Sequence, residues 1–151
     1  MKKHSVLCLI IEGEKILLGL RKKNPRKGTW SGYGGKVEPG ESVLEAAERE
    51  LLEESGIHAL TVSSIGFVTF SSREHEDEHV MHLFSVSKFI GEPKETDEMS
   101  PRWFRLDEIP YEKMSVTDSH WMPPLLEGRS ITGHFDMSEQ YEIKEFDIAF
   151  S

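Results

Sequence analysis

Residues 35–57 have the sequence GKVEPGESVLEAAERELLEESGI, and the expected fold depends on this stretch more than on any other. Pro39 and Gly40 interrupt regular structure near its start, and Gly56 stands where a helix C-terminal cap is expected. Between them, apolar side chains recur at helical spacing, at Leu44, Ala47 and Leu51. The pattern predicts a helix over residues 41–55 with a loop on either side.

Three glutamates of this helix, Glu50, Glu53 and Glu54, are expected on one helix face, within about 100° of arc. Like charges at these spacings repel one another, so the arrangement gains nothing unless cations gather there. Carboxylate oxygens suit Mg²⁺ or Mn²⁺, hard cations that also accept phosphate oxygens. The cluster therefore predicts metal-assisted phosphoryl chemistry. The alternative is a solvated acidic face with i, i+4 ion pairs to Arg49.

The same stretch resembles the signature motif of the Nudix hydrolase superfamily. All of its defining positions match, namely Gly35, Glu41, Arg49, Glu50, Leu51, Glu53, Glu54, Gly56 and Ile57. The resemblance implies a Nudix fold of the α/β class, in which an α/β/α sandwich surrounds a mixed β-sheet and carries a loop–helix–loop catalytic motif. It also implies hydrolysis of a nucleoside diphosphate linked to a further group.

The resemblance further implies roles for individual residues. Metal ligands are implied at Glu50, Glu53, Glu54 and the backbone carbonyl of Gly35. Arg49 is implied to orient one glutamate, and Glu41 to fix the loop. Glu53 is one candidate for the general base. Glu98, in the acidic connector before Trp103, is the other candidate base and a candidate metal ligand, although an acidic connector is also ordinary in a chain of this charge.

A basic loop precedes the glycine-rich segment Gly28 to Gly35. Residues 21–27, RKKNPRK, place five cations in seven positions of an otherwise acidic chain. Arg21 and Lys36 are the best-placed candidates for binding a polyphosphate. The alternative explanation is a solvated turn.

Beyond the motif, nearly the whole chain resembles the MutT-like branch that hydrolyses oxidised purine nucleoside triphosphates. The matching runs are residues 28–37, GTWSGYGGKV; 96–99, TDEM; 103–110, WFRLDEIP; and 118–121, DSHW. In that branch, aromatic walls enclose the base, which an asparagine and two neighbouring aspartates recognise. The resemblance places walls at Phe70 and Trp121 and base contacts at Ser31, Thr117 and Asp118.

Two of these positions depart from the branch, because Ser31 replaces the asparagine and Thr117 replaces an aspartate, and Ser115 stands where the branch has a further tryptophan. A serine hydroxyl cannot offer the paired donor and acceptor of an amide, which weakens bidentate recognition of a base edge. Each site residue also has a structural alternative: Phe70 and Trp121 could be packing residues, and Asp118 could be a helix cap.

Three histidines, His75, His79 and His82, suggest a zinc site as a competing idea. In a strand, however, His79 and His82 point to opposite faces, so the spacing counts against a shared metal. Loop and sheet-face positions are the favoured interpretation.

The rest of the chain predicts one domain, residues 1–151, in which strands alternate with two helices. Strands are expected at residues 6–11, 16–20, 60–71, 78–90 and 103–106, a second helix at 118–127 and a closing hairpin at 131–150. One cysteine among 151 residues favours a reducing, cytoplasmic compartment, and no apolar run is long enough to span a bilayer. A net charge of −9 opposes binding to duplex nucleic acid or a membrane.

The expected function is therefore Mg²⁺-dependent hydrolysis of nucleoside triphosphates to a monophosphate and pyrophosphate, with Mn²⁺ as a possible substitute. Oxidised purine nucleotides such as 8-oxo-dGTP are the leading substrates. Two alternatives stay open: another Nudix pyrophosphatase, acting on ADP-ribose, dinucleoside polyphosphates or RNA 5′ ends, and a catalytically silent nucleotide sensor.

Overall fold

The computed structural model describes residues 2–72 and 75–151. The strands are β1 (Lys2–Glu12), β2 (Lys15–Arg21), β3 (Trp30–Ser31), β4 (Tyr33–Lys36), β5 (His58–Ser72), β6 (His75–Ile90), β7 (Met99–Arg105), β8 (Ile131–Met137) and β9 (Ile143–Phe150). The helices are α1 (Val43–Ser55), a 3₁₀ turn at Tyr111–Lys113, and α2 (Asp118–Leu126). Among the described residues, no helix is both long and apolar enough to span a membrane.

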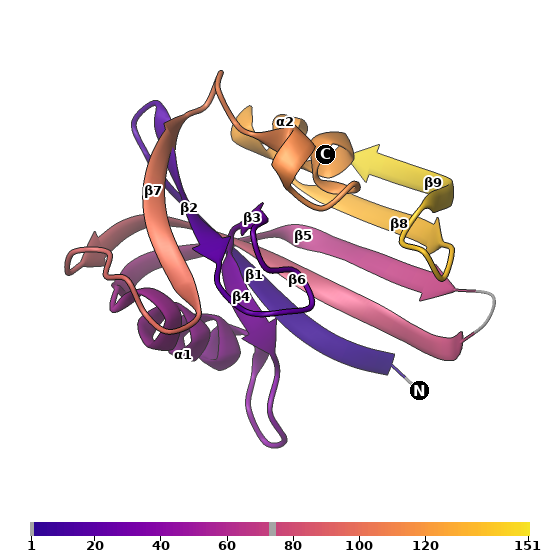
Figure 1. The fold of residues 1–151 in the computed structure, drawn as a ribbon, viewed down its shortest axis with the longest axis horizontal. Coiled ribbons are helices and arrows are strands. Elements are labelled where there is room, and N and C mark those ends of the chain that lie inside the picture. The colour runs from indigo at the N-terminus through magenta and orange to yellow at the C-terminus, as the bar shows by residue number, and fades with distance from the viewer. Residues whose placement is uncertain (1, 73–74) are drawn as a thin grey trace.

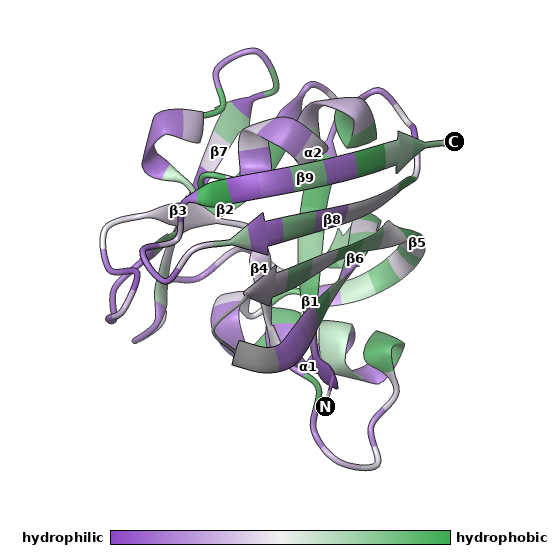
Figure 2. Cartoon of the chain, turned by 90° about the vertical axis from the view of Figure 1, so that its right-hand side faces the viewer, coloured by the Kyte–Doolittle hydropathy of each residue, from purple (hydrophilic) through white to green (hydrophobic). Residues whose placement is uncertain are grey.

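Within the described residues, all the strands join one sheet in the order β3-β2-β1-β6-β5-β8-β9, with β4 added to β1 and β7 to β2. The pairs β1–β6 and β5–β8 are parallel, whereas the other pairs are antiparallel. Figure 1 shows this arrangement, and Figure 2 shows the sheet between the two helices. The predicted α/β/α sandwich around a mixed sheet is therefore confirmed.

Strand β1 is apolar on both faces because both faces are covered. Val6, Cys8 and Ile10 pack in the α1-side core, which includes Ala46, Ala47, Leu51 and Ile57. The intervening Leu7 and Leu9 pack in the α2-side core, which includes Trp121, Met122, Leu125 and Phe135. The uninterrupted apolar run thus follows from a central strand whose side chains alternate between two cores.

The glycine-rich segment fills a gap in the sheet. β2 pairs with β1 only over Ile10–Glu12, and β4 takes the same edge of β1 over Ser5–Cys8. A side chain at Gly34 would come within 1.9 Å of the Val6 carbonyl oxygen, so only glycine allows this pairing. Strands β3 and β4 were not predicted from the sequence, because glycine is a poor indicator of strand.

Helix α1 begins at Val43, two residues later than predicted, because Ser42 is its N-cap. The Ser42 hydroxyl accepts a hydrogen bond from the Glu45 N–H, and the Glu45 carboxylate accepts one from the Ser42 N–H. Gly56 ends the helix in the left-handed conformation, with φ of 77°. Leu44 is exposed rather than part of the buried face, which Ala46, Ala47 and Leu51 form.

Candidate active site

Arg49 connects helix α1 to the loop that precedes it. Its guanidinium donates to both carboxylate oxygens of Glu41, at 2.6 and 2.9 Å, and to the Lys36 carbonyl at 3.0 Å. The Arg49 hydrogen bonds to Glu41, followed by one from the Glu38 N–H, hold the pKa of Glu41 at about 2, well below its usual value. The bidentate contact fixes the loop against the helix.

The same guanidinium also contacts two glutamates of the helix. It donates to Glu50 at 2.8 Å and to Glu53 at 3.3 Å. The Glu50 side chain is largely buried, whereas the Glu53 side chain is 60% exposed. A side chain at Gly35 would lie 2.5–2.7 Å from the Glu50 carboxylate, so glycine at this position is what lets the carboxylate rest against strand β4.

Glu54 is the most enclosed of the three acidic side chains, with 6% of its surface exposed. Its carboxylate accepts a hydrogen bond from the Gly34 N–H at 2.9 Å. Burial, followed by the nearby charge of Glu50, raises the pKa of Glu54 to about 8, although the Gly34 hydrogen bond and, after it, the charge of Arg21 oppose the shift. A buried carboxyl beside another carboxylate is stabilised in its charged form by a cation.

These residues fit a divalent metal ion in their chemistry. The carboxylates of Glu50 and Glu54 lie against the backbone of β4 at Gly35 and Gly34, and carboxylate oxygens are the ligands that hard divalent cations prefer. In this arrangement Arg49 bridges Glu50 and Glu53. Among the described residues, no three acidic, histidine or cysteine side chains are already close enough to chelate an ion.

Glu98 lies near this cluster in the connector before β7. Its backbone carbonyl accepts from the Lys22 N–H at 2.9 Å, and its own N–H donates to the Thr96 hydroxyl at 3.3 Å. That hydroxyl in turn donates to the Glu54 carbonyl at 3.2 Å. The Glu98 charge is close enough to contribute to the raised pKa of Glu54.

A cleft of about 900 Å³ opens beside the acidic cluster. Many of the predicted site residues line it, namely Arg21, Gly35, Lys36, Phe70, Thr117 and Asp118. Arg26 and Tyr141 also line it, together with Ser115. Arg26 belongs to the predicted basic loop, but no pattern in the sequence pointed to Tyr141, which reaches the cleft from the β8–β9 turn.

Asp118 forms a buried polar wall of the cleft at the first residue of α2. Burial raises the pKa of Asp118 to about 6, and the Arg26 charge is the largest effect opposing the shift. The Thr117 hydroxyl donates to the Asp118 carboxylate at 3.5 Å and lies 3.2 Å from the Ser115 hydroxyl. This part of the cleft offers hydrogen-bonding groups rather than rings.

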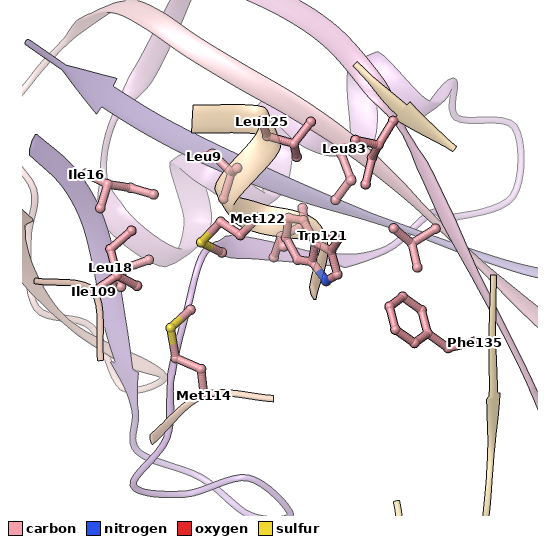
Figure 3. Close-up of a cluster of buried hydrophobic side chains, with 13 residues drawn as sticks. Leu9, Ile16, Leu18, Leu83, Ile109, Met114, Trp121, Met122, Leu125 and Phe135 are labelled. Carbon is pink, nitrogen blue, oxygen red and sulfur yellow. The ribbon is translucent and has the colours of Figure 1, made fainter. Parts of the chain in front are cut away.

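Two predicted base-binding residues are placed elsewhere. Trp121 is fully buried in the α2-side core, next to Asp118, and is not among the residues that line the cleft (Figure 3). The Ser31 hydroxyl donates to the Gly32 carbonyl at 2.8 Å, and Ser31 also lies outside the cleft lining. Both differences arise because helix and strand pairing decide which way a side chain points.

The histidines have separate partners. His79 Nε2 lies 2.7 Å from the Ser5 hydroxyl, whereas His82 Nε2 lies 3.0 Å from His4 Nδ1. The His75 side chain lies outside the described residues. The two described imidazoles of β6 therefore do not face a common ligand position.

Comparisons with known proteins match residues 1–125 to the NUDIX domain. The chain is 38% identical to an oxidized purine nucleoside triphosphate hydrolase of Mus musculus, over 93% of this chain and 94% of that protein. It is 40% identical to the protein of the same name in Danio rerio, over 85% and 83% of the two chains. The crystal structure of a MutT protein from Bacillus halodurans superimposes with a TM-score of 0.84, at 26% identity and 97% coverage of both chains.

Proposed function

The chain belongs to the Nudix hydrolase family, and from that premise we propose that it hydrolyses purine nucleoside triphosphates to a monophosphate and pyrophosphate. Oxidised purines such as 8-oxo-dGTP are the substrates we place first, because the mouse and zebrafish relatives carry that name and match nearly the whole chain. The observation that carries the proposal is the cleft itself. It extends from Gly34 and Gly35, the glycines that lie against Glu54 and Glu50, to a recess lined by Phe70 and Asp118.

Members of this family generally use divalent metal ions, and we propose Mg²⁺ here, with Mn²⁺ as a substitute. The residues that would hold it are Gly35, Glu50, Glu53, Glu54 and Glu98. When bound, the ion supplies charge neutralisation of the phosphates and activation of water. Arg49 contributes by holding Glu50 and Glu53 in place through its hydrogen bonds.

The remaining roles follow from position. Arg21 and Lys36 line the cleft beside Gly35, where their cationic groups can bind phosphate oxygens. Glu53 is the most exposed of the three helix glutamates and can accept a proton from water, with Glu98 as the alternative base. At the other end of the cleft, Phe70 offers a ring for stacking and Asp118 a carboxyl group for the base edge.

We further propose that residues 1–151 act as one domain on small nucleotides, without binding duplex nucleic acid or a membrane, and in the cytoplasm. All the described strands belong to one sheet, and the net charge is −9. Cys8 is buried, and burial raises the pKa of its thiol to about 12, so it is not a reactive group.

A substrate comparison tests the assignment. Turnover of 8-oxo-dGTP and dGTP is measured against ADP-ribose, dinucleoside polyphosphates and triphosphorylated RNA, with Mg²⁺ present. We expect the oxidised purine triphosphate to have the highest kcat/KM. A higher value for any non-triphosphate substrate, or for RNA 5′ ends, overturns the assignment in favour of that substrate class.

A charge-removing variant tests the catalytic role. Glu53→Gln is expected to lower kcat by about 10²–10⁴-fold, because the proposed base or ligand is lost. Glu48→Gln is the matched control, since Glu48 is exposed on the same helix. If the unmodified protein binds nucleotides without hydrolysing them, and Glu53→Gln binds them equally well, the chain is instead a silent nucleotide sensor.

A further inference from the structure

The turn between β8 and β9 brings a second aromatic ring to the cleft. Phe70 pairs with Phe135 across β5 and β8, and Ser72 pairs with Met137 at the end of β8. The turn that follows Met137 therefore lies at the same end of the sheet as Phe70. Tyr141, in this turn, lines the cleft together with Phe70.

The backbone at Tyr141 has an unusual conformation. Its φ is 60°, and among the described residues it is the sole non-glycine residue with a positive φ. Bulky residues rarely adopt this conformation, and a residue held there costs about 1–3 kcal/mol. Such a residue persists only where its surroundings impose the conformation.

Ser138 imposes that conformation. Its N–H donates to the Glu142 carbonyl at 2.8 Å, and its carbonyl accepts from the Tyr141 N–H at 3.1 Å. Its hydroxyl accepts from the N–H groups of Gln140 and Glu142, at 3.2 and 3.1 Å. The hydrogen bonds of Ser138 thus close the turn and fix the backbone of Tyr141 within it.

Tyr141 receives little packing in return, since 71% of the residue surface is exposed. An exposed aromatic ring, held in a costly backbone conformation at the edge of a cleft, stabilises the fold less than a glycine would at that position. The ring is therefore better explained by contact with something that enters the cleft.

Besides Tyr141, the cleft walls offer the rings of Phe70 and His79, and the His79 imidazole is tilted against Phe70 with ring centroids 6.0 Å apart. Phe70 already stacks on Phe135, with ring centroids 5.9 Å apart, so one of its faces is occupied. The α2 side contributes Ser115, Thr117 and Asp118. Among the described residues that line the cleft, Phe70 and Tyr141 are the two with benzene-type rings.

We propose that Tyr141 is a base-stacking residue that strengthens purine nucleotide binding in this cleft. This inference rests on the proposed function. Stacking depends on the π-face that every base has, so Tyr141 adds affinity for purines in general, while Asp118 contacts the base edge. Because the base lies away from the phosphates, the contribution falls on KM rather than on kcat.

The test compares ligands with and without a base. Tyr141→Ala is expected to weaken binding of 8-oxo-dGMP by about 5–30-fold, a stacking contribution at the lower end of the usual range. Binding of inorganic pyrophosphate should be unchanged, and Tyr141→Phe should bind 8-oxo-dGMP like the unmodified protein. Phe150→Ala removes another exposed ring that does not line the cleft and is the matched control.

A second variant separates binding from folding. Tyr141→Gly relieves the positive φ, so its Tm should be no lower than that of the unmodified protein while 8-oxo-dGMP binding weakens as for Tyr141→Ala. Equal 8-oxo-dGMP affinity in Tyr141→Ala and the unmodified protein overturns the inference, as does an equal loss for pyrophosphate. If the unmodified protein hydrolyses no purine triphosphate, the proposed function itself fails.

Discussion

Asp118 shows how a single carboxyl group can couple the cleft to the stability of the fold. It is 6% exposed at the start of α2, and burial raises its pKa to about 6 from an ordinary value of 3.8. The folded protein therefore binds the Asp118 proton more tightly than the unfolded chain does. Its ionisation opposes folding, and the opposition grows as pH rises from about 4 to about 6.

Asp118→Asn is predicted to remove this pH dependence. A difference of about 2 between folded and unfolded pKa values corresponds to about 3 kcal/mol, so the variant should gain up to that much stability relative to the unmodified protein above about pH 6.5. Near pH 4 the two proteins should be close to equal. Urea unfolding at the two pH values measures the difference, and a constant difference between them would contradict the prediction.

Strand β4 and helix α1 together position the acidic side chains Glu50, Glu53 and Glu54. β4 supplies two adjacent glycines, and each is required by a different neighbour. A side chain at Gly34 would meet the backbone of β1 at Val6, whereas a side chain at Gly35 would meet the Glu50 carboxylate. A backbone atom held in a sheet cannot move aside, but a carboxylate can.

The two glycines should therefore respond differently to replacement by alanine. Gly34→Ala is expected to lower the free energy of unfolding by about 2 kcal/mol or more, because the strand pairing is disrupted. Gly35→Ala should lower that free energy less but reduce kcat/KM by about 10–100-fold, because displacing Glu50 disturbs the proposed metal site. Thermal unfolding and steady-state kinetics on both variants provide the check. Equal effects of the two variants on both measurements would argue against this division of roles.

The whole molecule is organised by one sheet with a separate core on each face. The α1-side core supports the acidic cluster, and the α2-side core supports the cleft wall at Asp118. Because the sheet separates them, substitutions in the two cores share few packing partners. A substitution that weakens packing in one core should therefore leave the packing of the other core unchanged.

Conservative substitutions should be additive across the sheet. Ile16→Val in the α2-side core and Ile57→Val in the α1-side core are each expected to cost about 0.5–1.5 kcal/mol. The double variant should equal their sum within about 0.5 kcal/mol in denaturant unfolding. A coupling energy above about 1 kcal/mol would show that the cores are not independent. Ile10→Val with Ile57→Val, both in the α1-side core, is the comparison pair.

The sequence by itself determined the helix, the family and the acidic cluster, because each depends on local spacing along the chain. The signature motif from Gly35 to Ile57 occupies one helix with its flanking loops, and helical geometry alone places Glu50, Glu53 and Glu54 on one face of that helix. The apolar run of β1 likewise predicted a strand. Short glycine-rich strands were missed, because their pairing is set by neighbours distant in the sequence.

Tertiary structure decided which aromatic rings reach the cleft. Trp121 and Tyr141 are both aromatic residues in the second half of the chain, but α2 turns the first into the core and the β8–β9 turn brings the second to the cleft. Similarly, the Ser31 hydroxyl bonds within its own segment, whereas Arg26 lines the cleft. The face that a side chain presents depends on long-range strand register and helix packing, which local sequence patterns do not encode.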